Sequence, residues 1–309
     1  MADIHNVSEF LFLGLSSNQE VEIVCFVLFL LLYMAIVLGN LLMVVTVVAS
    51  RSLGSPMYFF LDSLSFVEIC YSSTTATKLI LDLLTEKKSI SVWGCMIQLF
   101  FIHFVGAAEI FLLTMMAYDC YVAICKPLHY TSIMNQSVCA VLMGTAWMGG
   151  FVHCLAQILL LLPLPFCGPN VIDHYFCDVF PVLKLACSDT FLIGLLIVAN
   201  GGTLSVISFV VLLASYVVIF FYLRTQSAEG WRKTLATCGC HVTVVILFFG
   251  PCVFIYLRPS DTLPVDKMIA VFYTVITPLL NPLIYSLRNA EVKKTMKCLW
   301  FRTMKVDEK

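Results

Sequence analysis

Two carboxylates, Glu68 and Glu109, lie in the middle of long apolar stretches of the sequence. Each stands about 11 residues from the end of its stretch that we expect to face the cell interior, a depth of roughly 16 Å at about 1.5 Å per residue. Two carboxylates at one depth in a dry interior cannot both be charged at low cost, so they share a proton or hold a cation. Asn40 and Asn281 fall at a similar depth. The group is predicted to form either a cation site or a neutral hydrogen-bonded cluster that only fixes helix packing.

A second group of polar residues lies nearer the other end of the apolar stretches. His103, Asn200 and Tyr256 fall at similar depth in three different stretches. Small residues beside aromatic ones leave room for a cavity, and sparse polar groups orient a ligand inside it. Each residue alone is more often a packing residue, so the prediction of a ligand pocket rests on the set. The neighbours at this depth are Gly106, Ala107, Leu204, Phe248 and Phe249.

The composition requires a membrane scaffold to position these residues. Of 309 residues, 61% are hydrophobic and 12% are charged, whereas soluble domains contain about 25% charged residues. A net charge of −1 gives no indication of a nucleic-acid partner. Stretches of roughly 20 apolar residues cross a bilayer, and their backbone must be helical to satisfy its own hydrogen bonds. The predicted fold is an all-α bundle of seven transmembrane helices, at about 23–49, 57–81, 94–118, 138–162, 191–223, 234–257 and 267–287.

The distribution of basic residues predicts the orientation in the membrane. Twelve Lys and Arg residues lie at one set of helix ends and six at the other, which places the N-terminus outside. We therefore expect an extracellular segment at 1–22, a seven-transmembrane domain at 23–288 and a cytoplasmic tail at 289–309. The tail is predicted to form a short amphipathic helix on the membrane surface. Asn6 begins an Asn-Val-Ser sequon on the outer side and is the predicted glycosylation site.

Four cysteines lie on the expected outer side. Cys95 begins the third apolar stretch, and Cys167, Cys177 and Cys187 lie in the following outer loop. Disulfides are expected there because that compartment is oxidising. Four cysteines allow three pairings, and their spacing does not choose among them.

Six short motifs follow one another along the chain. They are GN at 39–40, PMYFFL at 56–61, MAYDCYVAIC at 116–125 followed by KPLHY, SY at 215–216, KTLATC at 233–238 with His241, and PLLNPLIYSLRN at 278–289. One such motif arises easily by chance, but six in order at matching spacing do not. Over essentially its whole length the chain resembles the olfactory receptors of the rhodopsin-like class of G-protein-coupled receptors.

The resemblance implies roles for particular residues. The disulfides would be Cys95–Cys177 and Cys167–Cys187. Glu68 and Glu109 match an acidic pair that looks like an allosteric sodium site. The residues that match the odorant pocket are His103, Gly106, Ala107, Asn200, Leu204, Phe249 and Tyr256. The residues that match the switch and G-protein-coupling region are Asp119, Cys120, Tyr121, Tyr216, His241, Asn281 and Tyr285.

Two positions depart from the family pattern. Cys120 stands where the family has an arginine, which leaves Asp119 without its neighbouring ionic partner and puts coupling strength in doubt. Glu68 is one methylene longer than the usual aspartate, which puts the geometry of cation binding in doubt.

The function implied by the resemblance is odorant reception at the plasma membrane of olfactory sensory cilia. Small, mostly apolar volatile ligands would activate a stimulatory, olfactory-type G protein and raise cyclic AMP. Membrane lipid is the other expected partner, and no cofactor beyond sodium is expected. The alternatives are a receptor for another small molecule and a transporter, but the two halves of the chain show no repeat of the kind common in transporters. An enzyme is not expected, since no nucleophile–base pair lies at pocket depth.

Overall fold

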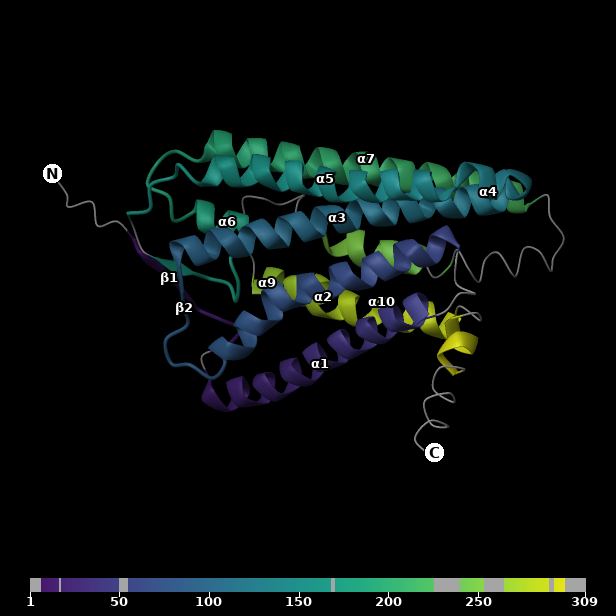
Figure 1. Ribbon diagram of the computed structural model, residues 1–309. Helices are drawn as coiled ribbons and strands as arrows, with labels where there is room; N and C mark the ends of the chain where they lie inside the picture. Colours follow the sequence, from purple (N-terminus) through teal and green to yellow (C-terminus); the bar gives the residue numbers. More distant parts are fainter. Residues whose placement is uncertain are drawn as a thin grey trace, which may run out of the picture.

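The computed structural model describes residues 7–16, 18–49, 55–167, 170–224, 239, 241–252, 264–288 and 292–297. Long helices run side by side along an elongated bundle, with α3 between its neighbours (Figure 1). The long helices are α1 (Gln19–Ala49), α2 (Pro56–Asp82), α3 (Val92–Cys125), α5 (Gln136–Leu161) and α7 (Phe191–Leu223). The shorter helical segments are η2 (Pro127–His129), α4 (Tyr130–Ile133), α6 (Val179–Leu183), His241–Cys252, α9 (Pro264–Val271), η3 (Phe272–Ile276) and α10 (Thr277–Arg288).

Five helical segments in the described part of the chain are long and apolar enough to cross a membrane. They are α1, α3, α5, α7 and Asp266–Ser286, which runs through α9, η3 and α10. α2 is of similar length but more polar, because it turns Ser65, Glu68 and Thr75 into the bundle. The expected sixth span is described mainly over His241–Cys252, a shorter apolar helix. α3 ends at Cys125 and so extends past the expected limit of 118, because Asp119 is buried and does not end the helix.

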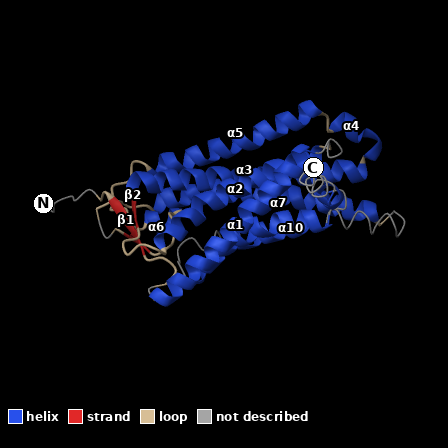
Figure 2. Cartoon of the chain, turned by 60° about the horizontal axis from the view of Figure 1, so that its bottom comes forward, coloured by secondary structure: helices blue, strands red, loops and turns tan. Residues whose placement is uncertain are grey.

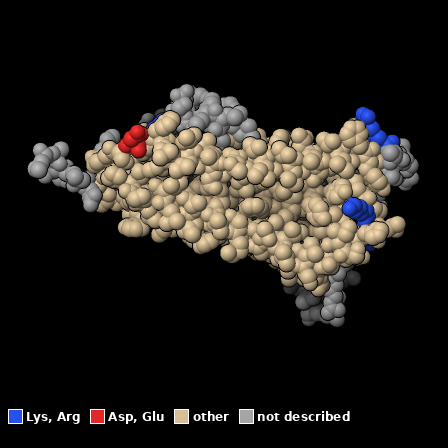
Figure 3. Space-filling view, turned by 90° about the horizontal axis from the view of Figure 1, so that it is seen from above, with Lys and Arg blue, Asp and Glu red and all other residues tan. Residues whose placement is uncertain are grey.

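The surface of the bundle matches this membrane assignment. Large apolar side chains such as Val48, Leu31 and Phe221 are exposed along the helices. On the face seen in Figure 3, the charged side chains of described residues lie at the two ends, and none is visible along the middle. A long uncharged belt of this kind is what the hydrocarbon core of a bilayer requires.

A small three-stranded sheet covers one end of the bundle, so the predicted all-α fold is incomplete. β1 (Glu9–Phe12) pairs antiparallel with β2 (Ser89–Ser91) and parallel with β3 (Val171–Ile172). In β1 the side chains alternate, and Phe10 and Phe12 are buried beneath the sheet. We call this end the sheet end and the other end, where α3 finishes and α5 begins, the opposite end (Figure 2).

The last span contains an irregular turn that the sequence did not predict. Phe272–Ile276 forms a π-helical turn between α9 and α10. Pro278 lies just after the π turn, and Pro282 is the proline inside α10; each lacks the backbone N–H that a continuous helix uses. The π turn carries Tyr273 and Thr274, which face the sheet end of the bundle interior, as described below. Single π turns of this kind are frequent at functional sites.

Glycine allows α3 and α5 to approach each other closely. A Cβ at Gly150 would lie 2.9 Å from the carbonyl oxygen of Phe104 and 3.0 Å from the backbone nitrogen of Ala108. Backbone atoms cannot move aside as the end of a flexible side chain can. The two helices therefore meet backbone to backbone at this point, directly behind the cavity described in the next subsection.

We expect Gly150→Ala to destabilise the receptor by about 1–3 kcal/mol, because the added methyl group must push α3 and α5 apart. Gly144→Ala is the matched control on the same helix, since a Cβ there meets nothing within 4 Å. Both changes gain the same helix propensity, up to about 1 kcal/mol. The apparent unfolding temperature of the detergent-solubilised protein measures the difference, and equal temperatures for the two variants would contradict the close approach.

Candidate functional site

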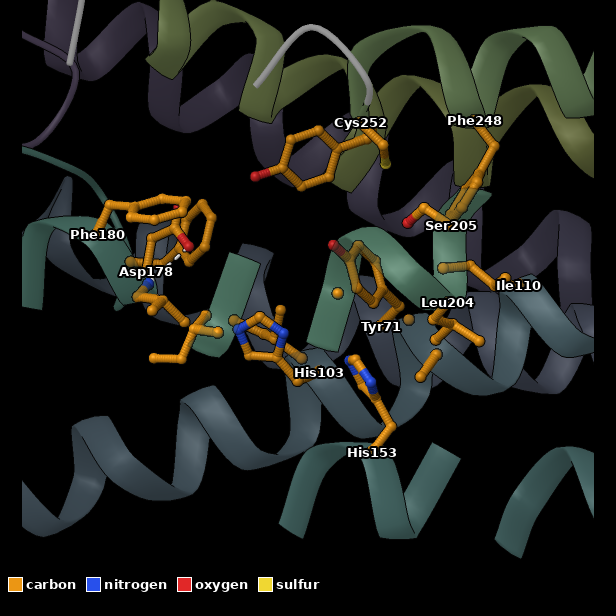
Figure 4. A pocket seen from close by; sticks show the side chains of 18 residues that line it. Tyr71, His103, Ile110, His153, Asp178, Phe180, Leu204, Ser205, Phe248 and Cys252 are labelled. Carbon is orange, nitrogen blue, oxygen red and sulfur yellow. Dashed lines mark hydrogen bonds between the residues drawn. The ribbon is translucent and has the colours of Figure 1, made fainter. Parts of the chain in front are cut away.

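A cavity of about 90 Å³ lies inside the bundle toward the sheet end (Figure 4). It is bounded by α2, α3, α5, α7, the helix His241–Cys252 and the π turn, and the loop between α5 and α7 closes it. Its walls are mostly apolar and carry a few polar groups, the composition typical of a small-molecule site. The lining residues are Tyr71, Ile102, His103, Gly106, Ala107, Ile110, His153, Phe176, Asp178, Val179, Phe180, Ile197, Gly201, Leu204, Ser205, Phe248, Cys252 and Tyr273.

Five of the residues predicted in or beside the pocket line this cavity: His103, Gly106, Ala107, Leu204 and Phe248. Two others, Asn200 and Phe249, are not among the lining residues. The ring of Phe249 packs instead against the ring of Phe248, with centroids 5.4 Å apart. Tyr256 lies outside the described residues, as does the predicted glycosylation site Asn6.

His153 is a cavity residue that the sequence analysis missed. The amide Nδ2 of Asn200 donates to the backbone oxygen of His153 at 3.2 Å. Nε2 of Gln157 lies 3.3 Å from Nε2 of His153, and because an amide N–H can only donate, this imidazole nitrogen accepts. The spacing of four residues between His153 and Gln157 on one helix face was the signal available in the sequence.

His103 faces the same cavity from α3. Its Nε2 atom is buried and has no hydrogen-bond partner among the described residues. A buried polar atom without a partner costs about 1–3 kcal/mol, so a ligand that supplies the partner recovers that free energy. The two imidazoles lie near each other in Figure 4, one from α3 and one from α5, and provide polar groups to a mainly apolar cavity.

The outer loop is fixed above the cavity by covalent and hydrogen bonds. Cys95 and Cys177 form a disulfide with their Cα atoms 5.5 Å apart, and Cys167 and Cys187 form another with 5.9 Å between Cα atoms. These are the pairings that the family resemblance implied. The hydroxyl of Tyr175 also lies 3.0 Å from the hydroxyl of Thr274 in the π turn. The loop is therefore tied both to α3 and to the last span.

Asp178 is the acidic residue of this loop that lines the cavity. Its carboxylate caps α6 by accepting the N–H of Val179 at 2.7 Å. Burial raises the pKa of Asp178 to about 6, the cap lowers it, and the charge of Asp266 raises it further. The cavity ceiling therefore carries a group that changes charge within the physiological range of pH.

The acidic pair lies deeper in the bundle, below the cavity. Glu68 and Glu109 are almost completely buried, and their carboxyl groups are hydrogen-bonded to each other. Nδ2 of Asn281 donates to Oε1 of Glu68. One oxygen of each of these three side chains, Oε2 of Glu68, Oε1 of Glu109 and Oδ1 of Asn281, has no partner. Asn40 extends the cluster toward α10 by donating to the backbone oxygen of Pro278 at 3.1 Å. A hydrogen bond between two carboxyl groups needs a proton on one of them, so the pair carries either that proton or a cation in its place.

The predicted switch residues lie near the opposite end. The hydroxyl of Tyr130 donates to Oδ1 of Asp119 at 2.9 Å, so this carboxylate, which has no arginine beside it at position 120, accepts a hydrogen bond from the next loop. Tyr130 follows α3 in the next loop, and this contact spans only 11 residues. The hydroxyl of Tyr216 is hydrogen-bonded to Nδ1 of His241, which joins α7 to the helix His241–Cys252. Tyr285 is buried in the bundle core.

Cys120 lies within this region as an apolar contact. It is 7% exposed and packs with Ile219 and Leu223 of α7. Tyr121 packs beside this small cluster, and Nζ of Lys126 lies 5.9 Å from its ring centroid. Where an arginine would present charge, this chain presents a packed side chain.

A family model described as olfactory receptor matches residues 29–302. The chain belongs to the olfactory receptor family. It is 73% identical to human olfactory receptor 4X2, over 98% of this chain and 100% of that protein. It is 59% identical to human olfactory receptor 4S2 over 100% and 99% of the two chains, and 57% identical to mouse olfactory receptor 4B13 over 97% and 98%.

As an olfactory receptor, the protein is a multi-pass component of the plasma membrane. Family membership implies odorant ligands and coupling to a G protein in general terms, and it makes the protein a receptor rather than an enzyme. A bundle of seven spans fits the family, and the five long apolar segments are part of it.

The raised pKa of Asp178 makes receptor stability depend on pH. Between about pH 4 and about pH 6 the folded protein holds a proton on Asp178 that the unfolded chain has released. Stability therefore falls as pH rises through this window, by on the order of 1 kcal/mol. We expect Asp178→Asn, which keeps the helix cap but cannot ionise, to remove this fall in the apparent unfolding temperature.

The matched control for this prediction is Asp189→Asn. Asp189 also accepts a backbone N–H, from Phe191 at 2.9 Å, but it is exposed. Its variant should keep the wild-type pH profile. A wild-type profile in Asp178→Asn as well would show that other groups determine the pH dependence.

Proposed function

We propose that this olfactory receptor binds small, mostly apolar volatile molecules in the cavity of Figure 4 and then activates a stimulatory, olfactory-type G protein that raises cyclic AMP. The observation that carries the proposal is a mainly apolar cavity with imidazoles on two walls and a disulfide-bonded loop across its outer side. Dispersion and desolvation supply most of the binding free energy in such a site, and the few polar groups orient the ligand.

The orientation in the membrane follows from chemistry at the two ends. Both disulfides lie at the sheet end, and disulfides persist on the oxidising side of the membrane. At the opposite end, Lys293, Lys294 and Lys297 are exposed on a helical segment whose Val292 is buried. We infer that the sheet end is extracellular and that this segment lies on the cytoplasmic membrane surface.

Ligand binding and the switch share two helices. α7 carries Leu204 at the cavity and Tyr216 near the opposite end. The helix His241–Cys252 carries Phe248 at the cavity and His241 seven residues away, which is about two turns or roughly 10 Å. A ligand that packs against both helices shifts the population toward the arrangement that it binds more tightly. The bond between Tyr216 and His241 is the contact that we expect this shift to change.

We also propose that the acidic pair binds a sodium ion that stabilises the resting arrangement. The three unpartnered oxygens of Glu68, Glu109 and Asn281 are hard donors of the kind that bind such cations. With sodium absent, a shared proton keeps the two carboxyl groups together. The cluster lies between the cavity and the switch, so its occupancy would bias both.

We expect His103→Leu to weaken the potency of oxygen-bearing odorants by about 5- to 100-fold, since it removes a hydrogen bond of about 1–3 kcal/mol. Asn200→Ala should weaken potency less, because Asn200 acts through His153. The measurement is the cyclic AMP concentration–response of transfected cells to an odorant panel, at matched surface expression. Met148→Ala is the control, since Met148 is 62% exposed on the same helix as His153. Unchanged potency in the His103 variant would place the ligand elsewhere, and the absence of a cyclic AMP response from the expressed receptor to every odorant would reject the proposed signalling.

If the acidic pair binds sodium, Glu68→Gln and Glu109→Gln should each abolish the effect of external sodium on agonist potency, because each removes a charge that holds the ion. The sodium dependence of the cyclic AMP response checks this, with Asp189→Asn as an acidic control far from the pair. Full activity with an unchanged sodium response in both Gln variants would assign the pair to helix packing alone.

A further inference from the structure

A second and larger cavity lies at the opposite end of the bundle. Its volume is about 520 Å³, against about 90 Å³ for the cavity at the sheet end. It is formed where α1 ends, α2 begins and α5 begins, and these three helix ends lie together at that end of the bundle in Figure 1. The two cavities share no lining residue. It is therefore a site distinct from the cavity at the sheet end.

Among the described residues that line this cavity, Asp62 is the one with a charged side chain. Its Oδ1 atom is buried without a hydrogen-bond partner, and no described residue forms an ion pair with its carboxylate. Ser55 and Gln136 contribute polar groups, and none of the described lining residues is Lys or Arg. The remaining walls are apolar or weakly polar: Val47, Val48, Pro56, Phe59, Met134, Cys139 and Ala140.

An unpaired carboxylate beside apolar walls is costly unless a cation or hydrogen-bond donor reaches it. A hydrocarbon chain suits the walls, and a positive head group suits Asp62. A phosphate would have no basic partner among the lining residues, which disfavours zwitterionic lipids. In the orientation inferred above, the cavity lies at the depth of the inner head groups, where an amphiphile can enter from the membrane.

We propose that this cavity binds an amphiphile that consists of a protonated amine head group and an apolar chain. The ammonium pairs with Asp62, and the chain fills the space between α1, α2 and α5. Met134 belongs to this cavity, and its backbone N–H donates at 2.8 Å to the backbone oxygen of Tyr130, the residue whose hydroxyl holds Asp119. An occupant therefore contacts the turn that carries a switch residue.

The test uses the full-length receptor in phosphatidylcholine nanodiscs with radiolabelled dodecylamine as the probe. Empty nanodiscs give the non-specific binding to be subtracted. The wild type should bind dodecylamine saturably, and Asp62→Asn should weaken its affinity at least about tenfold, the effect expected for a lost charge pair of roughly 1.4 kcal/mol or more. Asp189→Asn should bind as the wild type does. Ala140→Phe, which fills the cavity without touching the charge, should also reduce binding, so the test stands even where Asp62→Asn expresses poorly.

The possible results of this experiment distinguish an amine occupant from simple partitioning into lipid and from other head groups. Non-saturable binding, or equal affinity in the wild type, Asp62→Asn and Ala140→Phe, would mean that the amine only partitions into lipid, and the proposal fails. Displacement of the label by dodecanol at equal concentration would show that a hydroxyl donor suffices, which overturns the assignment to an amine. Displacement by phosphatidylethanolamine would overturn the exclusion of a phosphate head group.

Discussion

Hydrocarbon offers no hydrogen-bond partner to a polar side chain, so the polar residues of the spanning helices must find partners inside the bundle. Glu68 and Asn281 meet there from α2 and α10, and Glu109 joins them from α3. Asn40 reaches the carbonyl oxygen of Pro278 from α1. This one cluster connects the first three helices to the last span. A change in the proton or cation that this cluster holds would therefore act on the helices that line the cavity and on the helices that carry the switch residues.

The loop that covers the cavity above this cluster is anchored at two points. The disulfide to Cys95 holds the loop against α3, and the contact between Tyr175 and Thr274 holds it against the π turn. The N-terminal strand then pairs with two other segments over the top. A ligand from outside must pass this covered end or enter between helices. On the proposed function, the covering loop would contribute to ligand selectivity as well as to the fold.

The long helices and the location of the cavity could be predicted from the sequence because both depend on hydrophobic runs and depth along a helix. His103, Gly106, Ala107 and Leu204 were found in this way. His153 was not, since a histidine in an apolar helix looks the same whether it faces lipid or a cavity. The rotation of the helix about its own axis determines whether the side chain faces lipid or the cavity, and that rotation is fixed only by packing between helices.

Three other features depend on contacts that a linear pattern does not record. The three-stranded sheet forms from segments of two to four residues, too short for a periodic signal. The π turn adds a residue to one helical turn without a distinctive composition. The contact between Tyr130 and Asp119 needs the path of the loop after α3. Tyr130 belongs to one of the family motifs, but the motif does not indicate that its hydroxyl binds Asp119 in a chain with no arginine at position 120.

The small volume of the cavity at the sheet end has a consequence for the timing of the response. At about 90 Å³ it is well below the roughly 300 Å³ of an ordinary ligand pocket, so a molecule of more than a few heavy atoms has to wait for a wider conformer. The apparent dissociation constant then rises by the inverse of the fraction of receptors that are open. Association is slowed by the same fraction, because only the open conformer admits the ligand, and a bound ligand also leaves only when that conformer forms. On the proposed function, the opening rate of this cavity therefore limits how fast the receptor follows a change in ligand concentration.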